Sequence, residues 1–200
     1  MQKLRIRDLL TSFGLFLFFT FTVSAQTSPE NFPSVRIRNF GQMDERFFRG
    51  AQPLPDDFQT LKDLGVQTVI DLRNDPTDYE KTAVEALGMK YVNIPMSGWR
   101  YPKQKYIDQF LSLMADAGTG TVYVHCKAGI HRTGIAGAVY RFTKYGWDYD
   151  RAYREMKNYN FSSGLVHGRL KNFVEDYAEK MKADQAKIAA APKAATAAAQ

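Results

Sequence analysis

One short stretch, Thr121 to Gly137, restricts the folds open to this chain more than any other part of the sequence. It begins with the apolar run TVYV, whose β-branched and aromatic residues are typical of a buried strand. A loop of small and polar residues follows. Apolar residues then return at helical spacing, at Ile135, Ala138, Val139 and Phe142. We therefore predict a strand that turns through a short loop into the first turn of a helix.

The loop has the chemistry of an anion-binding site. Backbone N–H groups at the start of a helix lack internal partners, and in a tight loop they converge on one point. The helix dipole adds positive potential there. Arg132 brings a planar guanidinium that fits two phosphate oxygens at once. The same field favours a thiolate, so we expect the pKa of Cys126 to lie below its usual value of about 8.5.

The arrangement suits nucleophilic chemistry. A thiolate beneath a bound phosphate can attack phosphorus in line, and the Thr133 hydroxyl can help the sulfur to leave afterwards. A buried structural cysteine beside a helix-capping arginine is the competing interpretation, but it does not explain the glycine, arginine and threonine at these spacings. The candidate catalytic residues are Cys126, Arg132 and Thr133. The candidate substrate-binding residues are Lys127, Ala128, Gly129, Ile130, His131 and Arg132.

The pattern His-Cys, five residues, Arg-Thr-Gly resembles the signature loop of the cysteine-dependent protein tyrosine phosphatase superfamily. The chain looks most like the dual-specificity and atypical branch, in its bacterial, exported form. The resemblance implies that Cys126 is the nucleophile, Arg132 the phosphate clamp and Thr133 the leaving-group hydroxyl, with His125 supporting the cysteine from the strand. It also implies metal-independent hydrolysis of phosphomonoesters through a phosphocysteine intermediate. The expected substrate is a phosphorylated protein or a small-molecule phosphate, and no cofactor is expected.

The remaining sequence alternates predicted strands and helices, which favours a largely parallel α/β sheet. Strands are expected at Val35–Phe40, Arg46–Pro53, Val66–Leu72 and Met89–Ile94. Helices are expected at Asp56–Leu64, Tyr79–Leu87, Lys103–Ala117, Arg132–Tyr145, Asp150–Asn158 and Leu165–Lys182. The predicted fold is the compact α/β cysteine-phosphatase fold, with a central, mostly parallel sheet flanked by helices.

The N-terminus has the pattern of a secretory signal. A positive start precedes a mostly apolar run, Leu9 to Val23, with a cut expected before Gln26. That run is short for a membrane span of about 20 residues. We therefore expect a periplasmic or secreted protein without a stable membrane span after cleavage; an uncleaved N-terminal anchor is the alternative. The predicted divisions are a signal peptide at 1–25, a linker at 26–34, the phosphatase domain at 35–182 and an Ala/Lys-rich disordered tail at 183–200.

The charge and the cysteine content of the chain limit the ligands and partners that we expect it to bind. With 27 Lys and Arg against 21 Asp and Glu, the net charge is +6, which suits an anionic substrate. No long Lys/Arg patch indicates nucleic-acid binding, so no nucleic-acid partner is expected. The single cysteine allows no internal disulfide. No His, Asp or Glu cluster has the sequence spacing of metal ligands, and no metal is expected.

The sequence departs from the superfamily in its general acid. The family usually supplies an Asp from the loop after the third strand, but Pro95–Pro102 contains no carboxylate. Asp75, in the turn after the second strand of the βαβ series, is the nearest candidate by topology. Asp71 is expected to be structural and Asp108 to lie on a solvated helix face.

Other interpretations remain open. The leaving group can need little protonation, as in the branch that cleaves inositol pyrophosphates, whose loop ending Lys-His-Arg-Thr-Gly is partly matched at 130–134. Lys127-Ala128-Gly129 also matches tensin-type phosphoinositide phosphatases. A weakly active phosphate-binding module and a rhodanese-type sulfur transferase are further alternatives. Trp99, Arg100 and Tyr101 are expected either to wall the cleft, with Arg100 on a second phosphate, or simply to pack the loop. No function is assigned to His167.

Overall fold

The structure is a computed structural model and describes residues 32–190. Within this range, one sheet has five strands in the order β1-β2-β5-β3-β4. Only β1 runs antiparallel to its neighbour, so the predicted mostly parallel sheet is confirmed. The strands are β1 (Gly41–Asp44), β2 (Phe47–Ala51), β3 (Thr68–Arg73), β4 (Lys90–Met96) and β5 (Val122–Cys126).

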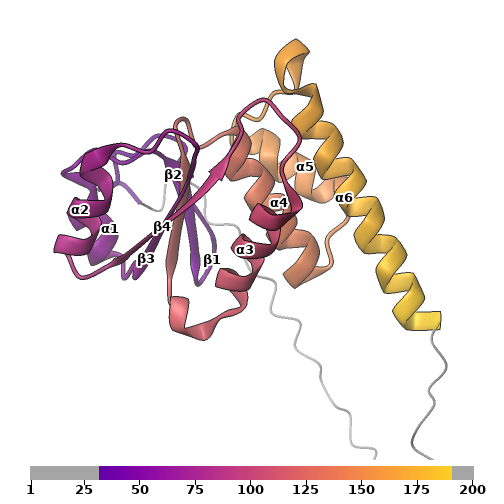
Figure 1. Cartoon of the computed structure of the whole chain (residues 1–200), viewed down its shortest axis with the longest axis horizontal. Coiled ribbons are helices and arrows are strands. Elements are labelled where there is room, and N and C mark those ends of the chain that lie inside the picture. The colour runs from indigo at the N-terminus through magenta and orange to yellow at the C-terminus, as the bar shows by residue number, and fades with distance from the viewer. Residues whose placement is uncertain (1–31, 191–200) are drawn as a thin grey trace, which may run out of the picture.

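Helices cover both faces of the sheet (Figure 1). On one face lie α1 (Asp57–Asp63) and α2 (Asp78–Ala86). On the other lie α3 (Gln104–Ala115), α4 (His131–Tyr145), α5 (Tyr149–Asn158) and α6 (Gly164–Ala190). A short 3₁₀ turn, η2 (Ala117–Thr119), leads from α3 towards β5. The predicted α/β class is therefore confirmed.

Burial explains why β3 and β5 occupy the centre. Every residue of both strands is buried, as expected of parallel strands that are covered on both faces. The larger core includes Ile70, Val124 and Phe110 and lies on the α3–α6 side. The smaller core includes Val69 and Phe58 and lies on the α1–α2 side.

The register gathers chemically active residues at one edge of the sheet. In the β2–β5 pair, Cys126 lies opposite Ala51. In the β3–β5 pair, His125 lies opposite Asp71. The loops that follow parallel strands meet beyond the carboxyl ends of those strands. The turn after β3 and the loop after β5 therefore share one side of the molecule.

Two of the predicted element boundaries were wrong. Residues 35–40 form no strand: the chain turns at Asn39, whose φ is +53°, and the antiparallel strand follows at Gly41–Asp44. Ile37 and Phe40 point into the smaller core from this turn, which produces the alternation that resembles a strand. At the other end, α6 continues to Ala190, past the boundary predicted at Lys182, because ADQAKIAA is rich in the best helix former. Residues 191–200 of the predicted tail lie outside the described residues.

The predicted divisions at the N-terminus stay predictions. The predicted signal peptide and most of the linker lie outside the described residues. Among residues 32–190, no helix combines the length and the apolar character needed to cross a membrane.

Candidate active site

The loop after β5 is shaped by a glycine and held by its carbonyl groups. Gly129 has φ +67°, and a Cβ there would lie 2.3 Å from the carbonyl carbon of Gly50, so only glycine fits. Two carbonyl groups of the loop accept hydrogen bonds from side chains outside the loop. Arg49 Nη2 donates to Gly129 O at 2.5 Å, and Asn39 Nδ2 donates to Ala128 O at 3.1 Å. With its carbonyls turned away, the loop leaves N–H groups free for an anion.

Arg49 supports the loop from the neighbouring strand β2. Its side chain is buried, and its guanidinium bonds the loop carbonyl and lies 3.9 Å from the centroid of the Tyr159 ring. Arg49 therefore holds the loop through the Gly129 carbonyl, and the charge of Glu155 also acts on its guanidinium.

Cys126 is buried at the base of this loop, with 3% of its surface exposed. Burial alone would raise the pKa of its thiol. Hydrogen bonds from the hydroxyl and N–H of Thr133, the charge of Arg132 and the N–H of Gly129 outweigh burial, so the pKa is lowered. The Thr133 hydroxyl is buried and, among the described residues, bonds no nitrogen or oxygen; its proximity to the sulfur favours the thiolate. The predicted lowering of the cysteine pKa agrees with this geometry.

Arg132 is held above the loop from two other strands. Its Nη1 donates to Asn74 Oδ1 at 3.2 Å, in the turn after β3, and to Met96 O at 3.4 Å, at the end of β4. These contacts fix one edge of the guanidinium. Arg132 is half-buried and lines a cleft, so its remaining donors are available to a ligand.

The cleft above Cys126 has a volume of about 420 Å³. Its lining comes from four separate parts of the chain: the turn after β3, the loop after β4, the loop after β5 and the start of α6. The lining residues are Asn74, Asp75, Gly98, Trp99, Cys126, Lys127, Ala128, His131, Arg132 and His167. Asp75 is exposed and is the single carboxylate among these lining residues.

Three stacked rings form one wall of the cleft. The ring centroids of His131 and His167 lie 3.5 Å apart, and those of His167 and Trp99 lie 5.1 Å apart, with nearly parallel planes. His131 Nε2 lies 3.0 Å from Ser162 O and donates to it. Burial lowers the pKa of both histidines, and the proximity of His167 and Arg132 lowers that of His131 further. The wall is therefore mostly uncharged at neutral pH.

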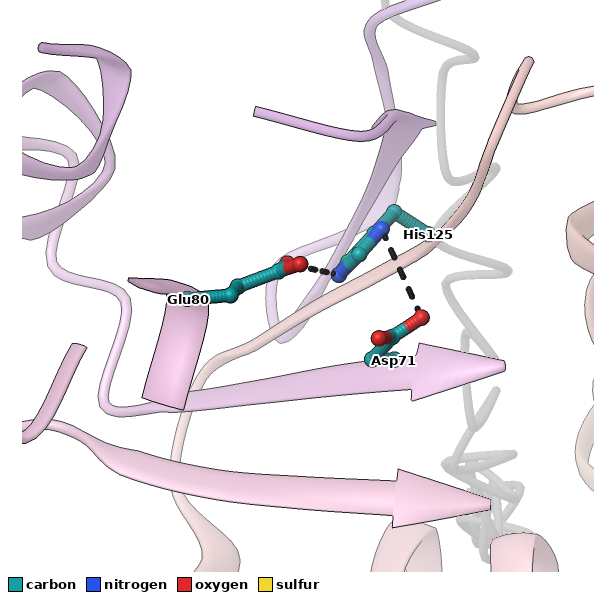
Figure 2. A group of neighbouring side chains, drawn as sticks. All are labelled: Asp71, Glu80 and His125. Carbon is teal, nitrogen blue, oxygen red and sulfur yellow. Dashed lines mark ion pairs between the residues drawn. The ribbon is translucent and has the colours of Figure 1, made fainter. Parts of the chain in front are cut away.

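Behind Cys126, a buried charge network joins three elements (Figure 2). His125 Nε2 lies 2.6 Å from Glu80 Oε1 on α2, and its Nδ1 lies 3.9 Å from Asp71 Oδ1 on β3. Arg73 bonds both carboxylates, and Tyr91 donates to Asp71 at 2.9 Å. The pKa of Asp71 is raised by burial but lowered overall by Arg73 and His125.

The network also bears on metal binding. Ligand atoms of Asp71, Glu80 and His125 lie within 4.8 Å of one another, a cluster that their sequence spacing does not reveal. Arg73 already occupies both carboxylates, and all three side chains are fully buried. The donor set therefore fits an internal ion network better than an open metal site.

Comparison with known proteins identifies the family. A family model described as a DSP-PTPase phosphatase fused to NAD+ kinase matches residues 26–176. The chain belongs to this family. The match spans the sheet, the loop after β5 and the first half of α6. Membership in the cysteine-dependent dual-specificity phosphatase superfamily, which was inferred from one loop, is therefore confirmed.

The individual relatives of this chain share less than a third of its residues over the matched segments. The dual specificity protein phosphatase TpbA of Pseudomonas aeruginosa is 28% identical over 123 residues, covering 62% of this chain and 55% of TpbA. Inositol diphosphatase DSP2 of Oryza sativa subsp. japonica is 29% identical over 114 residues, covering 54% and 55%. The chain thus spans about half the length of the curated relatives it matches. The TpbA crystal structure superposes with a TM-score of 0.65 at 23% identity, covering 82% of this chain and 98% of that one, which shows a common fold.

The predicted residues of the DSP-PTPase loop divide by position. Lys127, Ala128 and His131 line the cleft together with Cys126 and Arg132. Ile130 instead packs against the larger core. Gly129 and Thr133 are buried and reach the sulfur from behind.

Residues outside the loop gave mixed outcomes. Asp75 does lie at the cleft, whereas Asp71 is structural and Asp108 is exposed on α3, as expected. Trp99 lines the cleft with 61% of its surface exposed. His167, to which no function was assigned, also lines the cleft. No signal in the sequence could have revealed His167, because its contact with His131 depends on how α6 packs.

Proposed function

We propose that this chain is a metal-independent phosphatase that hydrolyses phosphomonoesters through a phosphocysteine intermediate, of the phosphotyrosine and dual-specificity type. The observation that carries the proposal is the lowered pKa of a buried Cys126 at the floor of a cleft, beneath Arg132 and the free N–H groups of the loop. Family membership supports the same reaction. So does TpbA, which has been solved in complex with phosphotyrosine.

In the first step, the Cys126 thiolate attacks phosphorus. An S–P bond forms and the bond from phosphorus to the leaving oxygen breaks. Arg132 and the loop N–H groups stabilise the charge on the equatorial oxygens. Lys127 and Ala128 provide loop backbone around the phosphate, and His131 bounds it on one side.

The leaving oxygen needs a proton, and we assign it to Asp75, the carboxylate among the residues that line the cleft. The neutral carboxyl transfers its proton to the leaving oxygen, which departs as an alcohol or phenol. In the second step, water attacks phosphorus and gives a proton to the Asp75 carboxylate. The S–P bond then breaks, and the Thr133 hydroxyl donates a hydrogen bond to the returning thiolate.

Hydrolysis assays with EDTA present test this assignment. We expect phosphate release from p-nitrophenyl phosphate and from a phosphotyrosine peptide, abolished in Cys126→Ser. Asp75→Asn should slow the peptide by about a hundredfold or more and slow p-nitrophenyl phosphate less, because nitrophenolate leaves without a proton. Asp78→Asn, an exposed substitution in the same segment, is the matched control. Loss of activity on chelation, or equal effects of Asp75→Asn on both substrates, would contradict the assignment.

A second candidate substrate class is the inositol polyphosphates, pyrophosphates or phosphoinositides. Resemblance to an inositol diphosphatase over about half of the chain favours it. A pyrophosphate leaving group also needs little protonation, which suits a cleft with one exposed carboxylate. Turnover of an inositol pyrophosphate that is insensitive to Asp75→Asn would favour this class. A site that binds vanadate but releases no phosphate from any of these substrates would instead be a phosphate-binding module.

We also propose that residues 1–25 direct export to the periplasm or beyond. The basic start and the apolar run support this, and the segment lies outside the described residues. The N-terminal sequence of the protein recovered from a bacterial periplasm tests it. A chain that starts near Gln26 is expected, whereas an intact N-terminus in the membrane fraction would favour the anchor.

A further inference from the structure

A second cavity of about 390 Å³ lies beside the catalytic cleft. Asn74 lines both, so the two cavities are adjacent at the turn after β3. The second cavity is bounded mainly by the loop between β4 and α3, in which Ser97, Arg100 and Lys103 contribute to the lining. This loop is separate from the cysteine loop, and its Gly98 and Trp99 also line the catalytic cleft.

The charge of this cavity is positive and uncompensated. Arg100 and Lys103 are both exposed, and within residues 32–190 neither side chain has a hydrogen bond or an ion pair. None of the residues that line the cavity is acidic. Two cations without an acidic partner in one concave site attract an anionic group, and a guanidinium suits phosphate oxygens best.

The loop that carries these cations is anchored. Ser97 Oγ accepts the N–H groups of Trp99 and Arg100 at 3.2 and 3.1 Å. Tyr101 donates to Asp176 on α6 at 2.5 Å, and its ring packs edge-on against Phe173. The loop therefore lies against α6 (Figure 1). A fixed backbone lowers the entropy lost when a ligand binds to the side chains.

Asn74 links the two sites chemically. Its Oδ1 accepts from Arg132 at 3.2 Å, and its amide nitrogen keeps two donor hydrogens for a ligand. An anion in the second cavity would thus share a residue with the clamp on the scissile phosphate.

We propose that this cavity is a second anion subsite that binds, through Arg100 and Lys103, a phosphate group next to the one being hydrolysed. The preferred substrates then carry at least two neighbouring phosphates. This proposal rests on the proposed function, since it names the substrate class of that same site.

The test compares substrates that differ in one feature. One arm uses a phosphotyrosine peptide with and without a phosphoserine beside the phosphotyrosine. The other compares myo-inositol monophosphate with a myo-inositol polyphosphate. The measured quantity is the ratio of kcat/KM for the substrate with more phosphates to that for the monophosphate. A charge-assisted hydrogen bond supports a preference of about tenfold or more in at least one arm, and that arm identifies the source of the second phosphate.

Two neighbouring lysines provide a matched comparison. We expect the ratio of kcat/KM to fall towards one in Lys103→Ala. It should fall further in the double variant Arg100→Ala/Lys103→Ala. Lys105→Ala removes the same charge two residues away, from a side chain that lies over the Tyr106 ring and does not line the cavity, and should keep the ratio. A ratio near one in the parent in both arms, or an equal fall in Lys105→Ala, would overturn the subsite.

Binding separates this proposal from the proposed function. Calorimetry of Cys126→Ser with the polyphosphate, with and without the Arg100 and Lys103 substitutions, requires no turnover. If the parent hydrolyses nothing but these substitutions weaken binding about tenfold, the function fails and the subsite stands. If they leave binding unchanged, the subsite fails whatever the activity.

Discussion

At the scale of single residues, the reactivity of the site depends on one balance at Cys126. Burial disfavours the thiolate, and Thr133, Arg132 and the Gly129 N–H favour it more strongly. The sequence revealed this balance, because the residues involved lie within eight positions of one another. It did not reveal the contact between His131 and His167, because the two residues lie on different helices and only the packing of α6 brings them together.

Thr133→Ala tests that balance directly. It removes the hydroxyl that stabilises the thiolate, so the pKa of Cys126 should rise. The pH dependence of Cys126 alkylation by iodoacetamide measures this: the midpoint should move to higher pH. Thr82→Ala, an exposed position on α2, should leave the midpoint unchanged. An unmoved midpoint in Thr133→Ala would contradict the hydrogen bond to sulfur.

The stacked histidines predict a pH effect on stability. Burial lowers the pKa of His167 in the folded chain, so the unfolded chain binds more protons as the pH falls below about 6.5. The stability associated with the neutral ring is present above that pH and is lost as the pH falls through it. Urea unfolding at about pH 7.5 and about pH 5 should show a smaller loss of stability in His167→Gln than in the parent. Equal losses would contradict the stacked, uncharged wall.

At the scale of elements, the β5–loop–α4 unit was predictable because its signals are local. The β-branched run, the glycine and the helical spacing all lie between Thr121 and Phe142 in the sequence. Residues 35–40 were misassigned because alternation alone does not distinguish a strand from a turn with two buried side chains. The network of Asp71, Glu80 and His125 was not predictable, since its members belong to three elements.

Gly129→Ala should dismantle the loop. The new Cβ would meet the backbone of Gly50 and Ala51 and occupy a left-handed conformation. Gly65→Ala is the matched control, because its φ is +83° but nothing lies within 4 Å of a Cβ there. Left-handed strain alone lowers the free energy of unfolding by about 1–2 kcal/mol, so Gly129→Ala should cost more than Gly65→Ala and should also abolish hydrolysis. Equal costs in urea unfolding would argue against the close approach.

Glu80→Gln tests the link between α2 and β5. It leaves Arg73 and His125 without one buried carboxylate charge, and breaking such a network lowers the free energy of unfolding by about 3 kcal/mol. Glu85→Gln lies on the same helix, in an exposed pair with Lys81, and should cost less than about 1 kcal/mol. Chemical denaturation measures the free energy of unfolding of both variants. Similar losses in Glu80→Gln and Glu85→Gln would show that the buried network adds little to stability.

At the scale of the whole molecule, alternating strands and helices fixed the class, and the parallel order placed the active loops on one side. What the sequence could not supply was the composition of the cleft, because four separate segments contribute to it. Asp75 could be proposed from topology alone. The place of His167 in the cleft, and the adjacency of the two cavities at Asn74, required the three-dimensional arrangement.

The central claim is that Cys126 carries the phosphoryl group. The direct measurement is rapid acid quenching of the protein during hydrolysis of a phosphotyrosine substrate, followed by mass spectrometry of its peptides. We predict one phosphoryl group on the peptide that contains Cys126, and none in Cys126→Ser. A phosphoryl group on another residue, or turnover by Cys126→Ser at the parent rate, would contradict the account.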